Sequence, residues 1–390
     1  MAGCAWGPGI CLLLLGCFFW ERGLAAADYD DYGPNSTDAE QHALSNGLCP
    51  RAVPGQAVWR NGTLFLAIPA ASRLQLSSRL ITVLLPSTYT AVFLVGLPLN
   101  GLALWVLATR VEKLPSTIFL MNLAAVDLLL GFLLPFKIAY YFLGNHWPFG
   151  EGLCRFTSAA FYGNMSCSML LLACISVDRY LAVAHPFFAR SCRSRPFAVG
   201  TCSAVWVAAA LLVVPLTCHR QSFPLNGTTL TLCHDVLPRG QEAEYYYYYF
   251  LCLVACGFLA PLLTMVLSST AMLRVLLGSG QKYATAIKLT VLVLSTMVAF
   301  YTPSNVLLLL HYAHSCSQRR GTFYVAYMVS LALTTCNTCA DPFVYYYVSE
   351  EFRAKVRGRL FGRRESSAFS LKTSKETLPP PRTSHSHSLA

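Results

Sequence analysis

Seven long runs of this chain are apolar and almost free of charge, and they limit the fold more than any other feature. A run of about 18 or more uncharged residues is long enough for a helix to cross a bilayer. Because backbone groups cannot hydrogen-bond to lipid tails, such runs cross as helices. The sequence therefore predicts an all-α membrane protein, a bundle of seven transmembrane helices. The predicted spans are about 84–109, 116–143, 153–183, 196–217, 245–274, 285–312 and 322–348.

The positive charge of the chain lies mostly on one side of these spans. The 390 residues are 55% hydrophobic and 12% charged, with a formal net charge of +11. Lys and Arg gather on one face of the membrane, which is the pattern of segments that stay in the cytoplasm. The charge therefore predicts a cytoplasmic carboxyl end and an extracellular amino end, and it argues against nucleic-acid binding. The basic residues are Arg110, Lys113, Arg190, Arg193, Arg195, Arg274, Lys282, Lys288 and the run 353–364.

The two ends of the chain lie outside the predicted bundle, residues 83–348. Residues 10–20 form a short apolar core followed by small residues at 25–27, so we expect a signal peptide over 1–27, with a non-cleaved anchor as the alternative. Sequons at Asn35, Asn61 and Asn226 fall in segments expected outside the cell and predict glycosylation. Residues 349–390 are expected to form a short cytoplasmic eighth helix and a disordered tail with phosphorylatable Ser and Thr.

Two cysteines are placed where a disulfide can form. Cys154 opens the third span and Cys233 lies in the loop before the fifth, both in oxidising surroundings. A bridge between them would hold that loop over the helix bundle. Cys49 and Cys316 are also expected outside and have no obvious partner.

Two carboxylates lie deep in the predicted membrane. Ionisable groups at this depth are costly and persist mainly where function needs them. Asp127 and Asp341 could converge with the neutral groups of Ser168 and Asn337. This oxygen-rich set suits a monovalent cation or a pair that shares a proton; a water-bridged structural network without an ion is the alternative.

The triplet Asp178-Arg179-Tyr180 lies at the expected cytoplasmic end of the third span. Paired, Asp178 and Arg179 satisfy each other in a poorly solvated place; separated, Arg179 can reach a partner protein. Such a two-state element can be biased by an agonist. Tyr345, which follows the Asp341-Pro342 break in the seventh span, is expected to take part in the same switch.

These motifs resemble those of rhodopsin-type G-protein-coupled receptors, and a narrower resemblance is to the protease-activated receptor family. It covers most of residues 96–362 and is carried by 97–109, 147–151, 233–235, 303–305 and 345–349, while Pro50–Gln56 resembles the family's activation site. The positions of Asp127, Ser168, Asn337 and Asp341 match those that line a sodium site in such receptors. Two departures, Ser269 for the usual Tyr and Tyr301 for the commoner Trp, concern the active state.

The resemblance implies how this chain is switched on. A protease cuts between Arg51 and Ala52, so that 28–51 is a propeptide and 52–82 carries the tethered agonist and an extracellular linker. The ligand begins with Ala52, Val53, Pro54, Gly55, Gln56 and Ala57. Its new cationic amine needs a counter-ion, for which Asp235 is the candidate, with His234 and Glu151 nearby. The resemblance also suggests Tyr162, Tyr312 and Tyr327 as agonist-binding residues.

The partners implied are thrombin or another trypsin-like serine protease, heterotrimeric G proteins and arrestin. The implied output is phospholipase C and calcium signalling in haemostasis, and no cofactor is expected beyond the sodium ion. Residues 52–82 contain no Asp or Glu, so slow cleavage is expected. A receptor for a diffusible ligand is the nearest alternative. A transporter would show internal repeats, and an enzyme would need a larger segment outside the membrane.

Overall fold

The computed structural model describes residues 53–360 except 61, 239–240, 279–283 and 314–319. The expectations for the signal peptide, the propeptide, the Arg51–Ala52 bond, the carboxyl-terminal tail, Asn35, Asn61, Cys49 and Cys316 therefore lie outside the described residues.

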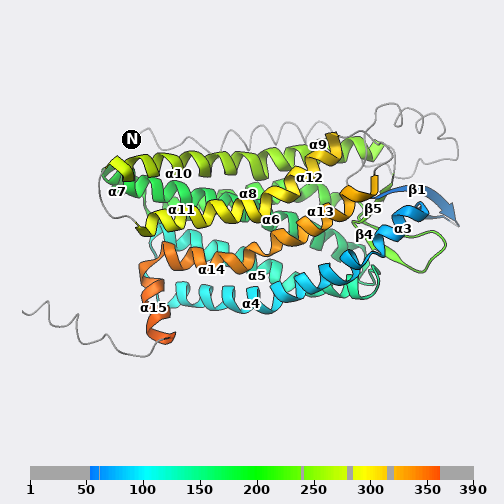
Figure 1. The fold of residues 1–390 in the computed structure, drawn as a ribbon, viewed down its shortest axis with the longest axis horizontal. Helices are drawn as coiled ribbons and strands as arrows, with labels where there is room; N and C mark the ends of the chain where they lie inside the picture. The colour runs from blue at the N-terminus through cyan, green and yellow to red at the C-terminus, as the bar shows by residue number, and fades with distance from the viewer. Residues whose placement is uncertain (1–52, 61, 239–240, 279–283, 314–319, 361–390) are drawn as a thin grey trace, which may run out of the picture.

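Long helices run side by side through the molecule (Figure 1). The first four are α4 (Leu85–Thr109), α5 (Pro115–Phe142), α6 (Gly150–Ala184) and α8 (Arg195–Cys218). Their bounds agree with the apolar runs to within a few residues. Among the described residues, six helical stretches are long and apolar enough to cross a membrane: Ser72–Thr109, Pro115–Phe142, Gly150–Ala184, Arg195–Cys218, Tyr248–Leu276 and Ile287–Leu310.

The fifth and sixth spans each contain a π-helical segment. The fifth consists of α9 (Gln241–Val254), η2 (Ala255–Leu259) and α10 (Ala260–Gly278). The sixth consists of α11 (Ala284–Thr296), η3 (Met297–Tyr301) and α12 (Thr302–Ala313). Each π segment ends two residues before a proline, Pro261 or Pro303. Proline has no N–H for the regular ladder, so the wider turn lets the helix continue past it.

The seventh span is made of two helices, α13 (Arg320–Thr335) and α14 (Asn337–Val348), which meet at Cys336. At 16 and 12 residues, neither alone is long enough to cross a bilayer. Together they cover the apolar run predicted at 322–348. The prediction of an all-α seven-helix bundle is confirmed.

Side chains divide between the inside and the outside of the bundle. Leu107, Leu120 and Leu171 are fully buried between helices, whereas Phe132, Leu263 and Val291 are exposed on its flank. Large apolar side chains facing outward suit a surrounding of lipid. The helices are therefore apolar both where they pack against one another and on their outer flank. Small clusters of polar side chains lie buried between them.

A small β-sheet covers one end of the bundle, at the right of Figure 1. Strands β1 (Val53–Arg60) and β2 (Thr63–Ala67) form an antiparallel hairpin, and β5 (Val236–Pro238) pairs with β1 in parallel. A second hairpin, β3 (Ser222–Pro224) and β4 (Thr231–Cys233), lies in the same loop as β5. Helix α3 (Ala70–Leu76) and the π segment η1 (Leu80–Leu84) lead into α4. The expected linker is therefore largely structured from Val53 onward.

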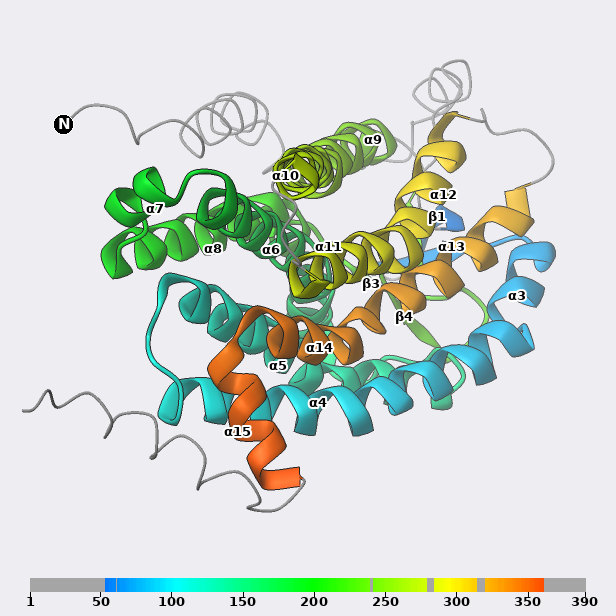
Figure 2. The ribbon, with the colours of Figure 1, turned by 60° about the vertical axis from the view of Figure 1, so that its left-hand side comes forward.

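Two short helices lie at the opposite end of the bundle. Helix α7 (Pro186–Cys192) joins α6 to α8, and α15 (Glu350–Leu360) turns away from the end of α14 (Figure 2). The side chain of Glu351 accepts a 2.8 Å hydrogen bond from the backbone N–H of Glu112 in the turn after α4. Helix α15 is the short eighth helix that the sequence predicts.

Candidate functional site

The loop between α8 and α9 is fastened to the top of α6. A disulfide joins Cys154 in α6 to Cys233 at the end of β4, with an S–S distance of 1.99 Å. This is the bridge expected from the sequence. It fixes the residues that follow Cys233, His234 and Asp235, above the ends of the helices.

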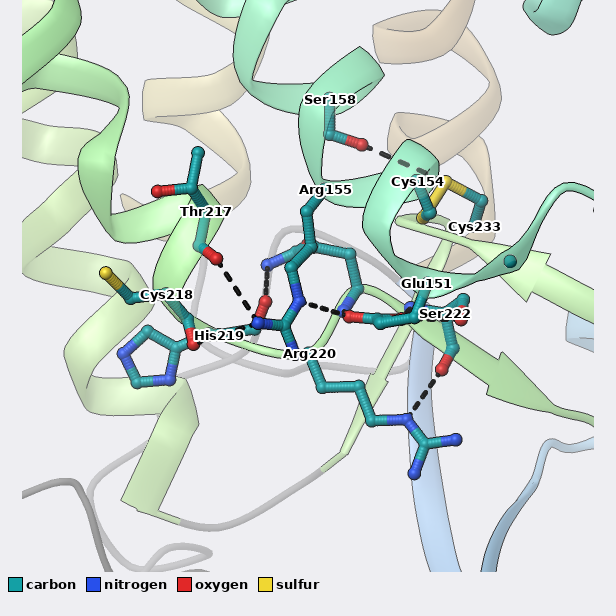
Figure 3. A network of polar contacts seen from close by, with 12 residues as sticks. Glu151, Cys154, Arg155, Ser158, Thr217, Cys218, His219, Arg220, Ser222 and Cys233 are labelled. Carbon is teal, nitrogen blue, oxygen red and sulfur yellow. Dashed lines mark hydrogen bonds and ion pairs between the residues drawn. A yellow bond between two sulfur atoms is a disulfide. The ribbon is translucent and has the colours of Figure 1, made fainter.

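Glu151 forms a second attachment next to the disulfide (Figure 3). Its carboxylate accepts hydrogen bonds from the backbone N–H groups of Gln221 and Ser222, at 2.8 and 2.7 Å, and from the Ser222 hydroxyl at 2.5 Å. Arg155, one turn later in α6, donates to it at 2.6 Å. Glu151 therefore anchors β3, and its bonds are made with the loop rather than with a ligand beside Asp235.

Arg155 also reaches the end of α8. Its Nη1 lies 3.3 Å from the carbonyl oxygen of Thr217 and 3.5 Å from that of Cys218 (Figure 3). Burial and the neighbouring Arg155 guanidinium lower the pKa of His219 from its usual value. His219 is therefore mainly neutral at neutral pH. The cations of this network are Arg155 and Arg220, whose Nε donates to the Ser222 carbonyl at 2.9 Å.

Backbone geometry at His234 directs Asp235 into the bundle. His234 has φ of 66°, a left-handed conformation that is uncommon outside glycine. Its N–H donates to the Gln221 carbonyl at 2.8 Å, and its Nδ1 lies 2.5 Å from the Gln221 side-chain oxygen. Asp235 is 2% exposed, and its Oδ2 accepts a 2.6 Å hydrogen bond from the Tyr140 hydroxyl of α5.

A small cavity lies below this loop. The Tyr162 ring packs edge-on against His234 at 5.7 Å, and its hydroxyl lies 3.3 Å from that of Tyr327. The structure thus groups four of the five expected agonist-binding residues; the side chain of Tyr312, in α12, lies outside the described ones. The cavity is lined by Tyr89, Lys137, Tyr141, Ser158, Phe161, Tyr162, His234, Asp235, Met328 and Leu331.

The segment expected to act as ligand pairs with the same loop. The N–H of Val53 donates to the backbone carbonyl of Asp235 at 2.9 Å, and Val53, Pro54 and Gly55 lie opposite Val236, Leu237 and Pro238. A Cβ on Gly55 would lie 2.9 Å from Cγ1 of Val236 and 3.0 Å from Cβ of Leu66. Only glycine fits this approach without displacing its neighbours.

A polar cluster lies in the middle of the bundle. Asp127, Ser168, Asn337 and Asp341 are all buried, and the two carboxyl groups lie next to each other. The Asn337 amide donates to Asp341 Oδ2 at 2.8 Å. Among the described residues, Ser168 Oγ, Asn337 Oδ1 and Asp341 Oδ1 are buried without a hydrogen-bond partner. Such an arrangement of acceptor oxygens suits a small cation.

Tyr345 belongs to this central cluster. Its hydroxyl donates to Asn100 Oδ1 at 2.8 Å and lies 3.5 Å from Asp127 Oδ2. Asn100 in turn donates to the carbonyl of Thr338 at 2.8 Å. Tyr345 therefore links the seventh span to the carboxylate pair, away from the Asp178–Arg179 pair with which the sequence grouped it.

The Asp178-Arg179-Tyr180 triplet lies in the last two turns of α6, at the end of the bundle that carries α7 and α15. Arg179 Nη2 lies 3.2 Å from Asp178 Oδ2. Arg193, just after α7, binds the same carboxylate more closely, with Nε at 2.6 Å from Oδ1 and Nη2 at 2.9 Å from Oδ2. Tyr180 pairs with His185 at 3.1 Å. Asp178, Arg179 and Arg193 therefore form a triad of one carboxylate and two guanidinium groups.

Comparison with known proteins identifies the family. The family model of the 7 transmembrane receptor (rhodopsin family) matches residues 99–345. The chain is 50% identical over 349 residues to Proteinase-activated receptor 4 of Homo sapiens, covering 89% of this chain and 90% of the relative. The chain belongs to the protease-activated receptor family. It is a multi-pass membrane receptor of the rhodopsin type and not an enzyme.

Other members of the protease-activated receptor family are also similar. Proteinase-activated receptor 4 of Mus musculus is 50% identical over 321 residues, covering 82% of this chain and 81% of that protein. Proteinase-activated receptor 2 of Homo sapiens is 39% identical over 320 residues, covering 80% of each. These matches extend well beyond the residues of the helix bundle's motifs, and they confirm the family that the motifs indicate.

Several residues that contact the predicted site residues were not predicted from the sequence. Arg193 could have been suspected, because it is a cation close in sequence to Asp178 on the basic side. Tyr140 gave no signal, since a tyrosine near the end of an apolar run is ordinary.

Asn226, an expected glycosylation site, lies in the β3–β4 turn, where its carbonyl accepts a 2.9 Å hydrogen bond from Arg73. Its glycosylation stays a prediction.

Proposed function

We propose that this receptor is switched on by thrombin, or by another trypsin-like protease, through cleavage between Arg51 and Ala52. The sheet-covered end of the bundle is then extracellular, and the end with α7 and α15 is cytoplasmic. The segment beginning at Ala52 acts as a tethered agonist, and the receptor activates heterotrimeric G proteins. The resulting phospholipase C and calcium signal serves haemostasis, and arrestin and tail phosphorylation end it.

One observation carries this proposal: the residues just after the cut are bound at the mouth of the bundle. Val53 is paired with the loop at Asp235, and consecutive Cα atoms are about 3.8 Å apart. A new amino terminus at Ala52 is therefore only one residue along the chain from Val53, the residue that hydrogen-bonds to Asp235. Addition of an extended segment to an existing strand is a common way of binding a peptide, because backbone hydrogen bonds supply affinity and side chains supply specificity.

Cleavage changes the charge at this point. A free α-amine has a reference pKa of about 7.7–8.0, so it is largely cationic at neutral pH, whereas the peptide bond it replaces is neutral. The buried Asp235 carboxylate has the opposite charge. Charge-assisted hydrogen bonds are roughly twice as strong as neutral ones. The cut thus creates an interaction that the intact chain does not have.

The signal crosses the bundle through elements that have two arrangements. The central cluster of Asp127, Ser168, Asn337 and Asp341 binds a sodium ion that favours the inactive state. At the cytoplasmic end, Arg179 leaves Asp178 and contacts the G protein. The close contacts of the triad and the acceptor oxygens of the central cluster support this assignment.

A calcium-release assay in cells tests the proposal. Thrombin and trypsin are applied to the wild type and to Arg51→Ala, and the free peptide Ala-Val-Pro-Gly-Gln-Ala is applied to both. We expect the wild type to respond to the protease, Arg51→Ala to lose that response, and both to respond to the peptide. A full protease response in Arg51→Ala would overturn the cleavage site and favour a diffusible ligand.

A further inference from the structure

Asp235 has two different partners on its two sides. Its backbone carbonyl accepts the hydrogen bond of Val53, whereas its carboxylate accepts that of Tyr140. Tyr140 is fully buried, yet it does not line the cavity beneath the loop, whereas Asp235 does. The Tyr140 bond therefore occupies Oδ2, and among the described residues no hydrogen bond to Oδ1 is found, so Oδ1 is the oxygen left for a ligand.

Tyr140 is itself held by the aromatic residues around it. Its ring packs edge-on against Tyr141 at 5.0 Å and against Trp147 at 6.0 Å. Trp147 is bound to the loop, since its backbone N–H donates to the Thr231 carbonyl at 2.8 Å. Tyr141 stacks on Tyr89 of α4 at 5.9 Å. The phenol is thus fixed in place by α5, α4 and the loop.

A carboxylate without such a partner could turn about its side-chain bonds. Ordering a side chain on binding costs free energy, and a group already held in the bound geometry avoids that cost. One hydrogen bond from a rigid donor fixes the direction of the carboxylate before the ligand arrives. Because Tyr140 has no charge, it orients Asp235 without supplying the counter-charge that a cationic ligand brings.

We propose that Tyr140 is a positioning residue for the tethered agonist, which orients the Asp235 carboxylate so that Oδ1 receives the new α-amine. This inference rests on the proposed function and adds to it the residue that prepares the counter-ion. Tyr140 does not touch the ligand; it acts through Asp235.

The test compares two peptides on the full-length receptor. One is Ala-Val-Pro-Gly-Gln-Ala with a free amine, and the other is its N-acetylated form, which keeps all side chains but has no cation. Both peptides compete with strand β1 of the receptor for the same loop, so the effect of that competition cancels when their potencies are compared. The receptors are the wild type, Tyr140→Phe, Asp235→Asn and the double variant, with Tyr248→Phe as the control, because Tyr248 is exposed on α9 and does not line the cavity.

Tyr140→Phe removes only the hydroxyl and keeps the ring packing. We expect the potency of the free-amine peptide to fall about five- to tenfold, the value of roughly one hydrogen bond. The acetylated peptide should be unaffected by Tyr140→Phe. In Asp235→Asn the second substitution should add little, because the two residues act as one unit. Tyr248→Phe, the same substitution outside the cavity, should leave the ratio of the two potencies unchanged.

Two outcomes would overturn the inference. An equal loss for both peptides, with lower surface expression, would give Tyr140 a structural role alone. Unchanged potency of both peptides in Tyr140→Phe would show that Asp235 needs no positioning. Either result leaves the proposed function intact if the wild type still responds to protease and Arg51→Ala does not. Failure of the wild type to respond to cleavage would overturn the proposed function itself.

Discussion

Arg193 binds both carboxylate oxygens of Asp178, at 2.6 and 2.9 Å, while Arg179 reaches one of them at 3.2 Å. The residue next to Asp178 in sequence is therefore its weaker partner. Asp178 is mostly buried, so it needs a cation whether or not Arg179 is present. Arg193 can remain on Asp178 when Arg179 leaves, which lowers the cost of separating Asp178 from Arg179.

Substitution of Arg193 by Gln should disfavour the active state. Without Arg193 the Asp178 charge depends on Arg179 alone, so their separation costs about 1–2 kcal/mol more, and agonist potency falls roughly five- to thirtyfold. G-protein activation in membranes measures this, with receptor number held equal. Arg193→Lys should recover part of the loss. Increased basal signalling in Arg193→Gln would contradict this role.

Gly55 should be needed for docking of the ligand strand. Its missing Cβ leaves room for Val236 and Leu66, and forcing extra atoms into such a contact costs about 1–3 kcal/mol. Gly55→Ala should therefore lower the response to protease roughly five- to hundredfold. Arg60→Gln, at an exposed position of β1 outside the ligand sequence, is the control. Val236→Ala in the Gly55→Ala receptor should restore part of the response; no restoration would place the defect elsewhere.

Loss of the Glu151 carboxylate should loosen the loop. Glu151→Gln keeps the size of the side chain but weakens the bonds to Gln221, Ser222 and Arg155. Hydrogen bonds to a charged group contribute about 1.5–3 kcal/mol each. We expect a lower melting temperature of the purified receptor and weaker agonist binding. Glu112→Gln, in an exposed 3.6 Å ion pair with Arg195, should change neither. Equal effects of the two substitutions would argue against a specific anchor.

The central carboxylates should make signalling depend on sodium. Replacing sodium by a large organic cation should raise agonist potency in the wild type, because we propose that the bound ion favours the inactive state. Asp127→Asn should reduce this dependence, since half of the paired charge is gone. Asn122→Ala, on the same helix but bound to Trp206, should keep it. A wild type that is indifferent to sodium would favour a structural network without an ion.

The membrane spans could be predicted because their signal is local. The second span was expected at 116–143 and is found at Pro115–Phe142; the fourth was expected at 196–217 and is found at Arg195–Cys218. Each is decided by a continuous apolar run. The Cys154–Cys233 bridge could also be predicted, because cysteines outside the membrane are few.

The contacts of the site were harder to predict, because they join segments far apart in the chain. Nothing near Val53 indicates pairing with Val236, since a short parallel strand pair depends on where the loop is held. Tyr140 and Arg193 meet their carboxylates only after helices and loops have packed. The apolar run of the seventh span is predicted correctly, but the break expected at Asp341-Pro342 is wrong: α14 continues through Pro342, and the two helices meet at Cys336 instead. Hydropathy does not report such backbone geometry.

The β1–β5 pairing has a consequence for pharmacology. In the intact chain the strand that becomes the ligand already occupies its edge of the loop. A soluble compound aimed at that edge competes with a segment whose effective concentration, set by its covalent attachment, is in the millimolar range. Such a drug faces this competitor before cleavage as well as after it.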